Sequence, residues 1–595
     1  MLQYEKHTRE GIEMDRVTES LVREFKESYE IHESETAELF EHFVNFCVTT
    51  KENGAEDIEL KELSTGPATQ GIDGMAIIVN RKIVNSTDEI DNLIKLNKQI
   101  NVKFVLIQSK TTASFDNSQI SNFLNFATIF FSEENSLFTS EEMQKFVELK
   151  NHILNHSSKL EKNPVLNLYY VTVGNWTDDL NLNAVIETNI KTLESTNLFS
   201  DINFFPCGAG EIQGMYRKTK SELSATFKFE KRVTMYSISE SELGYCGVLP
   251  FSEYTKIILD DNETLKPIFE DNIRDFLGLS QDVNKAIEDT VTEGNENAFS
   301  MMNNGVTIVA NSTTLSGDII TMKDYQIVNG CQTSHILFQN RHVDGIDRLM
   351  IPIRIIATED ENLKNSITRA TNNQTAIKKD QLEALSTFQK NLEEYYKTFI
   401  DDSQRLFYER RTGQYRNADI RRAKIVTIPM QIKAVTAMFL DNPSGVSGRY
   451  GTIAKNVGNK IFKRADRQAI YYTSALALYR IEALLNNSSI EKKFWKTRYH
   501  AMMLLRIIVG GEELPKFNQK KMDEYCQKIL DVLNDENLCL KYYKGIVNYI
   551  ASQAELDLND RKTFERNVTA ELLLKNISEL HDYLENNIEQ IEITE

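Results

Sequence analysis

The sequence predicts an α/β fold that is followed by a helical C-terminal region. Short apolar runs bounded by glycine or polar residues, at 75–79 and 102–107, are typical of buried strands. Between such runs, and again beyond residue 448, apolar residues recur at helical spacing. A chain of 595 residues is too long for one hydrophobic core. We therefore expect three parts, at residues 1–225, 226–440 and 441–595.

The first two parts are each predicted to alternate helices and strands. In the first part we expect two helices within 16–50, a helix at 118–131, and strands at 75–79, 102–107, 166–173 and 202–205. In the second part we expect strands at 305–310, 325–328 and 349–357, and helices at 273–277, 333–338 and 380–399. A loop is predicted at 443–448, and helices continue from there nearly to the acidic end of the chain.

Composition and charge exclude several classes of protein. A formal net charge of −19 excludes a surface that is basic throughout, so a nucleic-acid partner must be held at a local patch. The six cysteines lie far apart with no CxxC pair, which argues against disulfides and favours a reducing cytoplasm. Charges run through the N-terminal segment, and the apolar stretch at 501–511 is short and broken by Arg506. We expect a cytoplasmic protein with no membrane partner.

Two strands of the first part end in residues that suit a metal-dependent reaction. Asp73 precedes the strand at 75–79, and Gln108 and Lys110 close the strand that begins at 102. Side chains alternate along a strand, so Gln108 and Lys110 point to one face, and Asp73 meets them if the strands are neighbours. A carboxylate and an amide oxygen can hold Mg²⁺, which activates water. Lys110 can orient that water or stabilise charge on a phosphate.

These three residues resemble the motif of the PD-(D/E)xK nuclease superfamily, in its Mrr and RecB-like form with glutamine in place of the middle acid. The resemblance implies a restriction-endonuclease-like domain over about residues 1–225. It also implies that a helical glutamate completes the metal site; Glu41 is the best candidate, with Glu38 behind it, and Gln119 could be the polar position on the following helix.

The nuclease that this resemblance implies depends on Mg²⁺ or Mn²⁺ and cleaves phosphodiester bonds in nucleic acid, with DNA favoured over RNA. Its catalytic residues would be Asp73, Gln108, Lys110 and Glu41, with Asp73, Gln108 and Glu41 as metal ligands. Nucleases of this superfamily often act as dimers, which implies a homodimer. The alternative is structural: an aspartate at the turn before a strand and a solvated Q-x-K strand end are both common.

Five segments of the second part carry a more specific resemblance. They are NIRDFLGLSQDVNKAIEDT (272–290), FSMMNNGVTIVA (299–310), YQIVNGCQTSHILF (325–338), ATNNQTAIKKDQLEAL (370–385) and YERRTGQY (408–415). Together and in this order they resemble the AIPR family, named for abortive infection and phage resistance. AIPR proteins carry this core behind a variable and often nuclease-like N-terminal part. The resemblance implies anti-phage defence with a phage-derived trigger.

A strand–turn–helix within these segments predicts a second binding site. Asn329 and Gly330 form the turn, and the backbone N–H groups of the following helix can bind an anion. Amides and two arginines nearby can recognise a base edge or a phosphate. The candidate ligand-binding residues are Asn304, Asn329, Gly330, Gln332, Thr333, Asn373, Gln374, Arg410 and Arg411. Alternatively, such amides satisfy backbone groups at strand ends and only staple the fold.

The stretch 405–424 is the densest basic segment of this acidic chain. Its arginines, with Tyr408 and Tyr415 interleaved, are typical of a surface that binds single-stranded nucleic acid. The alternative is an arginine-rich loop that pairs with acidic groups elsewhere, and the two interpretations have equal weight. Another pair, His152 and His156, is spaced to share a helix face, but in a polar helix we expect them to face solvent rather than a metal.

Three functions therefore compete. The first is a defence effector, a metal-dependent endonuclease that cleaves phage or host nucleic acid under control of the AIPR core. The second is a non-catalytic sensor or adaptor that binds a nucleic acid, a nucleotide or a phage component. The third is a restriction subunit that works with a methyltransferase. The sequence lacks a GxxxxGK[ST] phosphate loop, an HExxH motif and a GxSxG elbow, which argues against the enzymes that use them.

Overall fold

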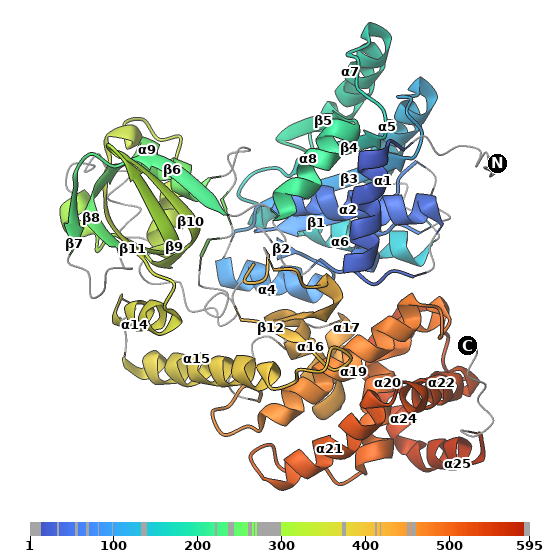
Figure 1. Ribbon diagram of the computed structural model, residues 1–595. Helices are drawn as coiled ribbons and strands as arrows, with labels where there is room; N and C mark the ends of the chain where they lie inside the picture. Colours follow the sequence, from blue (N-terminus) through green and yellow to red (C-terminus); the bar gives the residue numbers. More distant parts are fainter. Residues whose placement is uncertain are drawn as a thin grey trace, which may run out of the picture. The chain divides into compact units, whose positions relative to one another are not determined.

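The structure is a computed structural model (Figure 1), and it describes residues 14–32, 35–53, 58–66, 69, 71–80, 82–97, 99–132, 138, 140–220, 223–235, 243–259, 265–266, 268–269, 299–371, 376–410, 413–416, 418–448, 453 and 460–587. The chain forms two compact units. The first consists of Met1–Thr219, Phe388–Arg410 and Ala418–Glu595, and the second of Lys220–Thr387 and Arg411–Asn417.

The first unit begins with a five-stranded sheet, the N-terminal sheet, in the order β2-β1-β3-β4-β5. Strand β1 is antiparallel to β2 and β3, whereas β3, β4 and β5 are parallel. Its strands are β1 (Gly74–Val79), β2 (Lys82–Ile83), β3 (Val102–Lys110), β4 (Val165–Thr172) and β5 (Asp201–Cys207). Its helices are α1 (Arg16–Ser28), α2 (Thr36–Asn53), α3 (Leu60–Leu63), α4 (Thr87–Asn97), α5 (Asn117–Phe131), α6 (Glu141–Asn155), α7 (Leu180–Glu194) and α8 (Ala209–Lys220).

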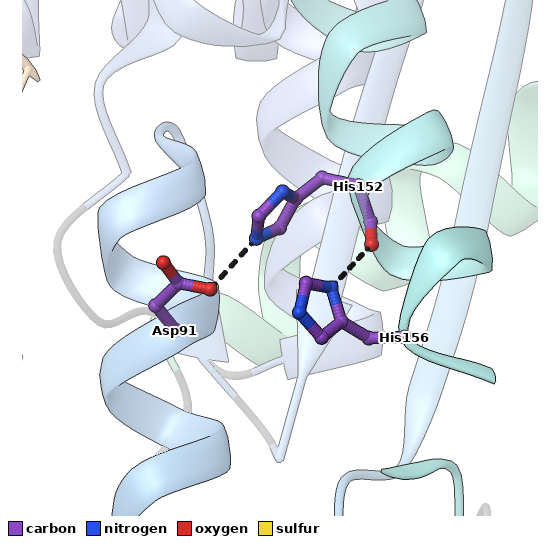
Figure 2. A group of neighbouring side chains, drawn as sticks. All are labelled: Asp91, His152 and His156. Atoms are coloured by element: carbon purple, nitrogen blue, oxygen red, sulfur yellow. Dashed lines mark hydrogen bonds and ion pairs between the residues drawn. The ribbon is translucent and has the colours of Figure 1, made fainter. Parts of the chain in front are cut away.

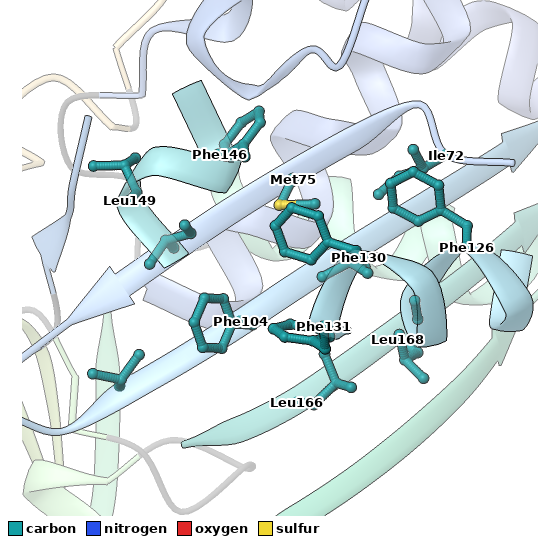
Figure 3. Packing of buried hydrophobic residues seen from close by; sticks show 14 of the residues in the cluster. Ile72, Met75, Phe104, Phe126, Phe130, Phe131, Phe146, Leu149, Leu166 and Leu168 are labelled. Atoms are coloured by element: carbon teal, nitrogen blue, oxygen red, sulfur yellow. The ribbon is translucent and has the colours of Figure 1, made fainter. Parts of the chain in front are cut away.

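Both faces of the N-terminal sheet are buried by helices. Because side chains alternate along β1 and β3, Met75 and Phe104 pack on one face with Phe130 of α5 and Leu149 of α6 (Figure 3). The neighbouring Val105 packs on the opposite face with residues of α1, α2 and α8. Burial on both faces explains why these strands read as continuous apolar runs in the sequence.

The rest of the first unit is helical. Its central helices, α16 (Ile428–Phe439), α19 (Gln468–Asn486) and α20 (Arg498–Gly510), pack against one another. Around them lie α17 (Pro443–Gly448), α21 (Lys521–Asn534), α22 (Glu536–Ser552), α23 (Arg561–Glu565), α24 (Asn567–Lys575), α25 (Ile577–Asn587), the 3-10 helix η6 (Lys492–Thr497), the end of α15 (Ala376–Lys397) and the parallel pair β12 (Phe407–Glu409) and β13 (Ile425–Thr427). We call this region the helical layer, and we call the N-terminal sheet with its helices α1 to α8 the α/β layer.

Charged side chains join the helical layer to the α/β layer within this unit. Glu59, at the start of α3, accepts hydrogen bonds from Lys433 of α16 and from Arg498 Nη2 at 3.1 Å. Arg498 is 6% exposed, so this pairing takes place away from water. A second contact joins Glu30 to Arg421 and to the Tyr479 hydroxyl at 3.0 and 2.9 Å. The pairing of Arg498 with Glu59 is costly to break because it would leave the charge of Arg498 buried without its partner, whereas Arg421 is 59% exposed.

The second unit contains a six-stranded sheet, the central sheet, in the order β6-β10-β9-β11-β8-β7. All neighbouring strands are antiparallel except β9 and β11. Its strands are β6 (Ser224–Lys228), β7 (Arg232–Met235), β8 (Leu243–Pro250), β9 (Val306–Ser316), β10 (Ile319–Asn329) and β11 (Met350–Ala357). Helices α9 (Phe251–Ile258), α12 (Phe299–Met302), α13 (Cys331–Gln339) and α14 (Glu361–Thr371) accompany it.

The structure confirms the mixed α/β fold with a helical C-terminal region. The two helices expected within 16–50 and the helix expected at 118–131 are α1, α2 and α5, and the seven expected strands are all present. The loop expected at 443–448 is wrong, because these residues form α17 and the Asn442 side chain accepts a hydrogen bond from the Gly445 N–H in its first turn. The helix expected at 273–277 lies outside the described residues.

Candidate active site

Asp73 is held by its backbone at the point where β1 begins. Its N–H donates to the carbonyl of Ile107 in β3 at 2.9 Å, which sets Asp73 beside the end of that strand. Its carbonyl oxygen lies 3.4 Å from Nδ2 of Asn45, a buried residue of α2. A side chain at position 74 would meet Asn45, since a Cβ there would lie 2.1 Å from Asn45 Oδ1. Glycine at 74 therefore lets α2 approach the strand closely.

The carboxylate of Asp73 is oriented by three donors. Oδ2 accepts from Gln108 Nε2 at 2.5 Å, from the Ser109 N–H at 2.7 Å and from the Ser109 hydroxyl at 3.0 Å. Because Gln108 uses its amide nitrogen here, its carbonyl oxygen is the end left to serve another partner. Gln108 is 2% exposed, so its side chain is fixed by the surrounding protein. The structure thus brings Asp73 and Gln108 together, as expected from the sequence.

Glu41 of α2 and Lys110 of β3 share the electrostatic environment of Asp73. Burial, and then the negative charge of Asp73, raise the pKa of Glu41 to about 7, while Lys110 opposes the shift. Burial also raises the pKa of Asp73, against the charge of Lys110 and the hydrogen bonds from Ser109 and Gln108. Two half-buried carboxylates close to one lysine make a site that favours additional positive charge. We call Asp73, Glu41, Gln108 and Lys110 the Asp73 site.

Glu38 differs from the residues of the Asp73 site because its carboxylate contacts two cationic or polar partners outside that site. It lies one helical turn before Glu41, with Oε1 3.8 Å from His42 Nε2 and 3.4 Å from Lys492 Nζ. The hydrogen bond with His42 and the charge of Lys492 lower its pKa to about 2, against the effect of burial. Glu38 is therefore already engaged as a carboxylate, which makes Glu41 the better candidate of the two.

Gln119 of α5 approaches the same edge through a tyrosine. Its Oε1 lies 3.2 Å from the hydroxyl of Tyr170, which donates to it. Tyr170 is the register partner of Gln108 in β4, and burial followed by the charges of Asp116 and Asp73 raises its pKa. Gln119 is exposed, so it lies at the rim rather than among the buried groups.

Two supporting residues were not predicted from the sequence. Ser109 supplies two of the three hydrogen bonds to Asp73, and Asn45 lies behind the Asp73 backbone. A sequence signal existed for Asn45, because it is a lone amide within the apolar run 43–48 of α2. Ser109 gave no signal, since a serine next to Gln108 is equally compatible with a solvated strand end.

The Asn329 turn, residues 329–333, has the predicted strand–turn–helix geometry. Strand β10 ends at Asn329, Gly330 adopts a φ of +91°, and α13 starts at Cys331. Asn329 Nδ2 donates to the Thr371 carbonyl at 2.9 Å, and Thr333 is 4% exposed. The amide nitrogen of Asn329 thus donates its hydrogen bond to the backbone of α14.

Asn303 and Asn304, two amides of the preceding segment, differ in their surroundings. Asn303 Oδ1 accepts from the Gly305 N–H at 2.9 Å and so caps its own turn, whereas Asn304 is exposed. Asn373, Gln374, Arg411 and the side chain of Gln332 lie outside the described residues. Of the ligand-binding residues expected from the sequence, Asn304 is the one with an exposed side chain in the described part of the chain.

Three basic side chains of the stretch 405–424 pair with acidic groups of the first unit, namely Arg410, Arg421 and Lys424. Arg410 Nε lies 3.1 Å from Glu393 Oε2, and both side chains are about nine-tenths buried. Arg421 pairs with Glu30. Tyr408 is fully buried with its hydroxyl bonded to Gln389, so it is wrong as a base-stacking residue. These contacts favour the pairing interpretation for the residues that make them.

Comparison with known families identifies the larger part of the chain. The model of the AIPR protein family matches residues 269–593, more than half of the sequence. The chain belongs to the AIPR family. Membership links it to abortive infection and phage resistance, as the sequence motifs implied. The matched residues begin after the N-terminal sheet, so the match does not include the Asp73 site.

No match was found among curated proteins or among solved structures. Among the described helices of this AIPR protein, none is both long and apolar enough to cross a membrane.

Proposed function

We propose that this AIPR protein is a metal-dependent nuclease that acts as an effector of anti-phage defence. The observation that carries the proposal is the convergence of Asp73, Glu41, Gln108 and Lys110 at one edge of the N-terminal sheet. Asp73 precedes β1, Gln108 and Lys110 lie in β3, and Glu41 lies in α2; the sequence resemblance to PD-(D/E)xK nucleases assigns a role to each. Family membership supplies the setting of phage resistance.

The donor set fits Mg²⁺ or Mn²⁺. Asp73 and Glu41 provide carboxylates and Gln108 provides a carbonyl oxygen, which are the hard ligands that these ions prefer. The negative charge of Asp73 contributes to the raised pKa of Glu41, and a divalent cation would relieve the repulsion between these two carboxylates. A metal bound by these residues would polarise the phosphate and lower the pKa of bound water.

The protein groups would then position the reaction. Ser109 holds the Asp73 carboxylate in place through its N–H and hydroxyl, and Gln108 holds the same oxygen. Lys110, the cation of the site, would orient water or stabilise charge that develops on the scissile phosphate. We propose DNA rather than RNA as substrate and a homodimer as the active form, both from the superfamily resemblance.

Contacts between the matched AIPR region and α2 and α3 support control of this site. Lys492 reaches Glu38, one turn before Glu41 on α2, and Arg498 and Lys433 hold Glu59 beside α3. A rearrangement of η6 or α20 would therefore be felt by the helix that carries Glu41. We propose that a phage-derived trigger acts through the AIPR region along these contacts.

Purified full-length protein tests the proposal directly. Plasmid DNA, linear DNA and RNA are incubated with Mg²⁺, Mn²⁺ or EDTA, using wild type, Asp73→Asn and the control Asp179→Asn, whose carboxylate caps α7. We expect metal-dependent cleavage by wild type and by the control only. Phage protection by a folded Asp73→Asn protein would favour the alternative, a non-catalytic sensor or adaptor.

A further inference from the structure

A separate polar cluster joins α4 to α6 on one face of the N-terminal sheet (Figure 2). His152 lies in α6, His156 follows the last residue of α6, and Asp91 lies in α4. His152 Nε2 is 2.8 Å from Asp91 Oδ1, and the two imidazole centroids are 4.6 Å apart. One ligand atom from each of the three residues can be chosen so that all lie within 4.8 Å of one another.

We propose that Asp91, His152 and His156 bind one divalent transition-metal ion, Zn²⁺, which fastens α4 to α6. This site is independent of the proposed nuclease function and uses none of its residues. The sequence spacing supplied only the histidine pair. The third ligand became visible when α4 was found to pack against α6.

The orientation of His156 supports metal binding. Its Nδ1 lies 2.9 Å from the carbonyl oxygen of His152. Since a carbonyl only accepts, Nδ1 is the donor in this hydrogen bond, and Nε2 is the ring nitrogen left to bind a metal. Metal-ligating histidines commonly donate their other ring N–H to a backbone carbonyl, which fixes both tautomer and ring direction. In Figure 2 both rings are turned toward the Asp91 side.

The ligand types and their exposure specify the kind of ion. Two imidazoles and one carboxylate suit Zn²⁺ and its neighbours in the first transition row, whereas Mg²⁺ prefers oxygen ligands. The side chains of His152 and Asp91 are 24% and 40% exposed, so an ion can enter and a water can complete its coordination. The two metal sites of the protein would therefore be distinguishable by the metals they take.

The cluster lies toward the opposite end of β3 from the Asp73 site. The carbonyl of His156 accepts from the Lys159 N–H, and the Lys159 carbonyl accepts from the Ile100 N–H, each at 2.8 Å. Ile100 precedes β3, whereas Gln108 and Lys110 close it. A strand of this length spans about 30 Å, so an ion at the cluster would brace the layer without touching the scissile phosphate.

Zn²⁺ titration of the metal-free full-length protein tests the proposal. The titration uses Asp73→Ala protein, so that the Asp73 site does not contribute, and compares it with the same protein carrying His152→Gln and His156→Gln. We expect the Asp73→Ala protein to bind one Zn²⁺ per chain and the variant that also lacks both histidines to bind it at least about tenfold more weakly. Zn²⁺ should raise the melting temperature of the Asp73→Ala protein by about 5 °C. The exposed His342→Gln is the matched control and should bind as its parent does.

Two results would overturn the proposal. One is equal Zn²⁺ affinity with and without the two histidines. The other is no binding at micromolar Zn²⁺ by the folded parent, which would leave His152 and Asp91 as a hydrogen-bonded pair only. If the double variant does not fold, X-ray absorption of Zn²⁺-loaded wild type decides instead: two imidazole ligands support the site, and fewer than two exclude it.

Discussion

The Asp73 site and the Asn329 turn are two clusters of polar side chains that both lie at the end of a strand beside a glycine, but these side chains have different partners. At the Asp73 site, three donors orient one carboxylate, a second carboxylate lies close by, and Lys110 is the nearby cation. At the Asn329 turn the Asn329 side chain donates to a backbone carbonyl of its own unit, and the separate Asn303 side chain accepts from a backbone N–H of that unit. The hydrogen bonds at Asn329 and Asn303 thus close within the fold, whereas the two carboxylates of the Asp73 site outnumber the charge of Lys110.

The largest expected effect is at the Asp73 site. Asp73→Asn and Lys110→Ala should each lower the rate of cleavage by about a thousandfold, equivalent to about 4 kcal/mol of transition-state stabilisation, because each removes charge that acts on the phosphate or its metal. Single-turnover cleavage and phage plating measure this, with circular dichroism to verify folding. Wild-type cleavage by either variant would break the contrast between the two clusters.

The next largest effect is expected at the Asn329 turn, on stability alone. Gly330 has a φ of +91°, and a Cβ there would lie 2.8 Å from Val306 Cγ2 and 2.9 Å from the Gly305 carbonyl oxygen. Gly330→Ala should destabilise the second unit by about 3 kcal/mol, from left-handed strain and crowding together. Urea denaturation measures it. A Gly317→Ala control also has positive φ but open space, so it should cost less.

A buried histidine outside both clusters tests the effect of burial alone. His500 is fully buried, and burial lowers its pKa to about 3. Between pH 6.5 and pH 3, His500 is therefore protonated in the unfolded state but not in the folded state. The stability that comes from keeping His500 neutral in the fold is fully present above pH 6.5 and is lost as the pH falls toward 3. Between pH 7 and pH 5 we expect a loss of about 2 kcal/mol. His500→Gln should flatten this part of the stability curve; an unchanged slope would assign it to other groups.

Gln108→Glu separates the structural from the functional use of an amide. The substitution removes the donor to Asp73 Oδ2 and adds a third carboxylate, so the metal-free protein should lose about 1–2 kcal/mol of stability. Mg²⁺ should restore that stability, and cleavage should persist with a changed preference between Mg²⁺ and Mn²⁺. Melting curves in EDTA and in Mg²⁺ measure both. A loss of cleavage as complete as for Lys110→Ala would show that the Gln108 N–H groups are required.

The smallest effects compare two asparagines of the central region. Asn329→Ala should cost about 1 kcal/mol, since the Thr371 carbonyl loses its donor, while Asn304→Ala should stay within about 0.5 kcal/mol. Calorimetric titration with nucleotides and short oligonucleotides accompanies the stability measurements. If wild type binds one of them and Asn304→Ala does not, the Asn329 turn is a ligand site and the contrast between the clusters has to be revised.

The sequence alone determined the pattern of elements, the AIPR family and the identity of the residues at the Asp73 site. Apolar periodicity reports which faces are buried, so α1, α2, α5 and the strands could be predicted from it. The sequence also placed Asp73 and Gln108 at strand ends, where a two-residue period fixes the direction of side chains.

Tertiary structure alone decided which polar groups meet. Ser109 and Asn45 support Asp73 across gaps of 36 and 28 residues, and Asp91 joins His152 across 61. It also decided that Tyr408 is buried and that 443–448 is a helix, because packing against distant elements overrides a local preference. The physical reason is the same throughout: sequence periodicity encodes the direction of a side chain from its own element, whereas its partner is chosen by the packing of elements that are distant in the chain.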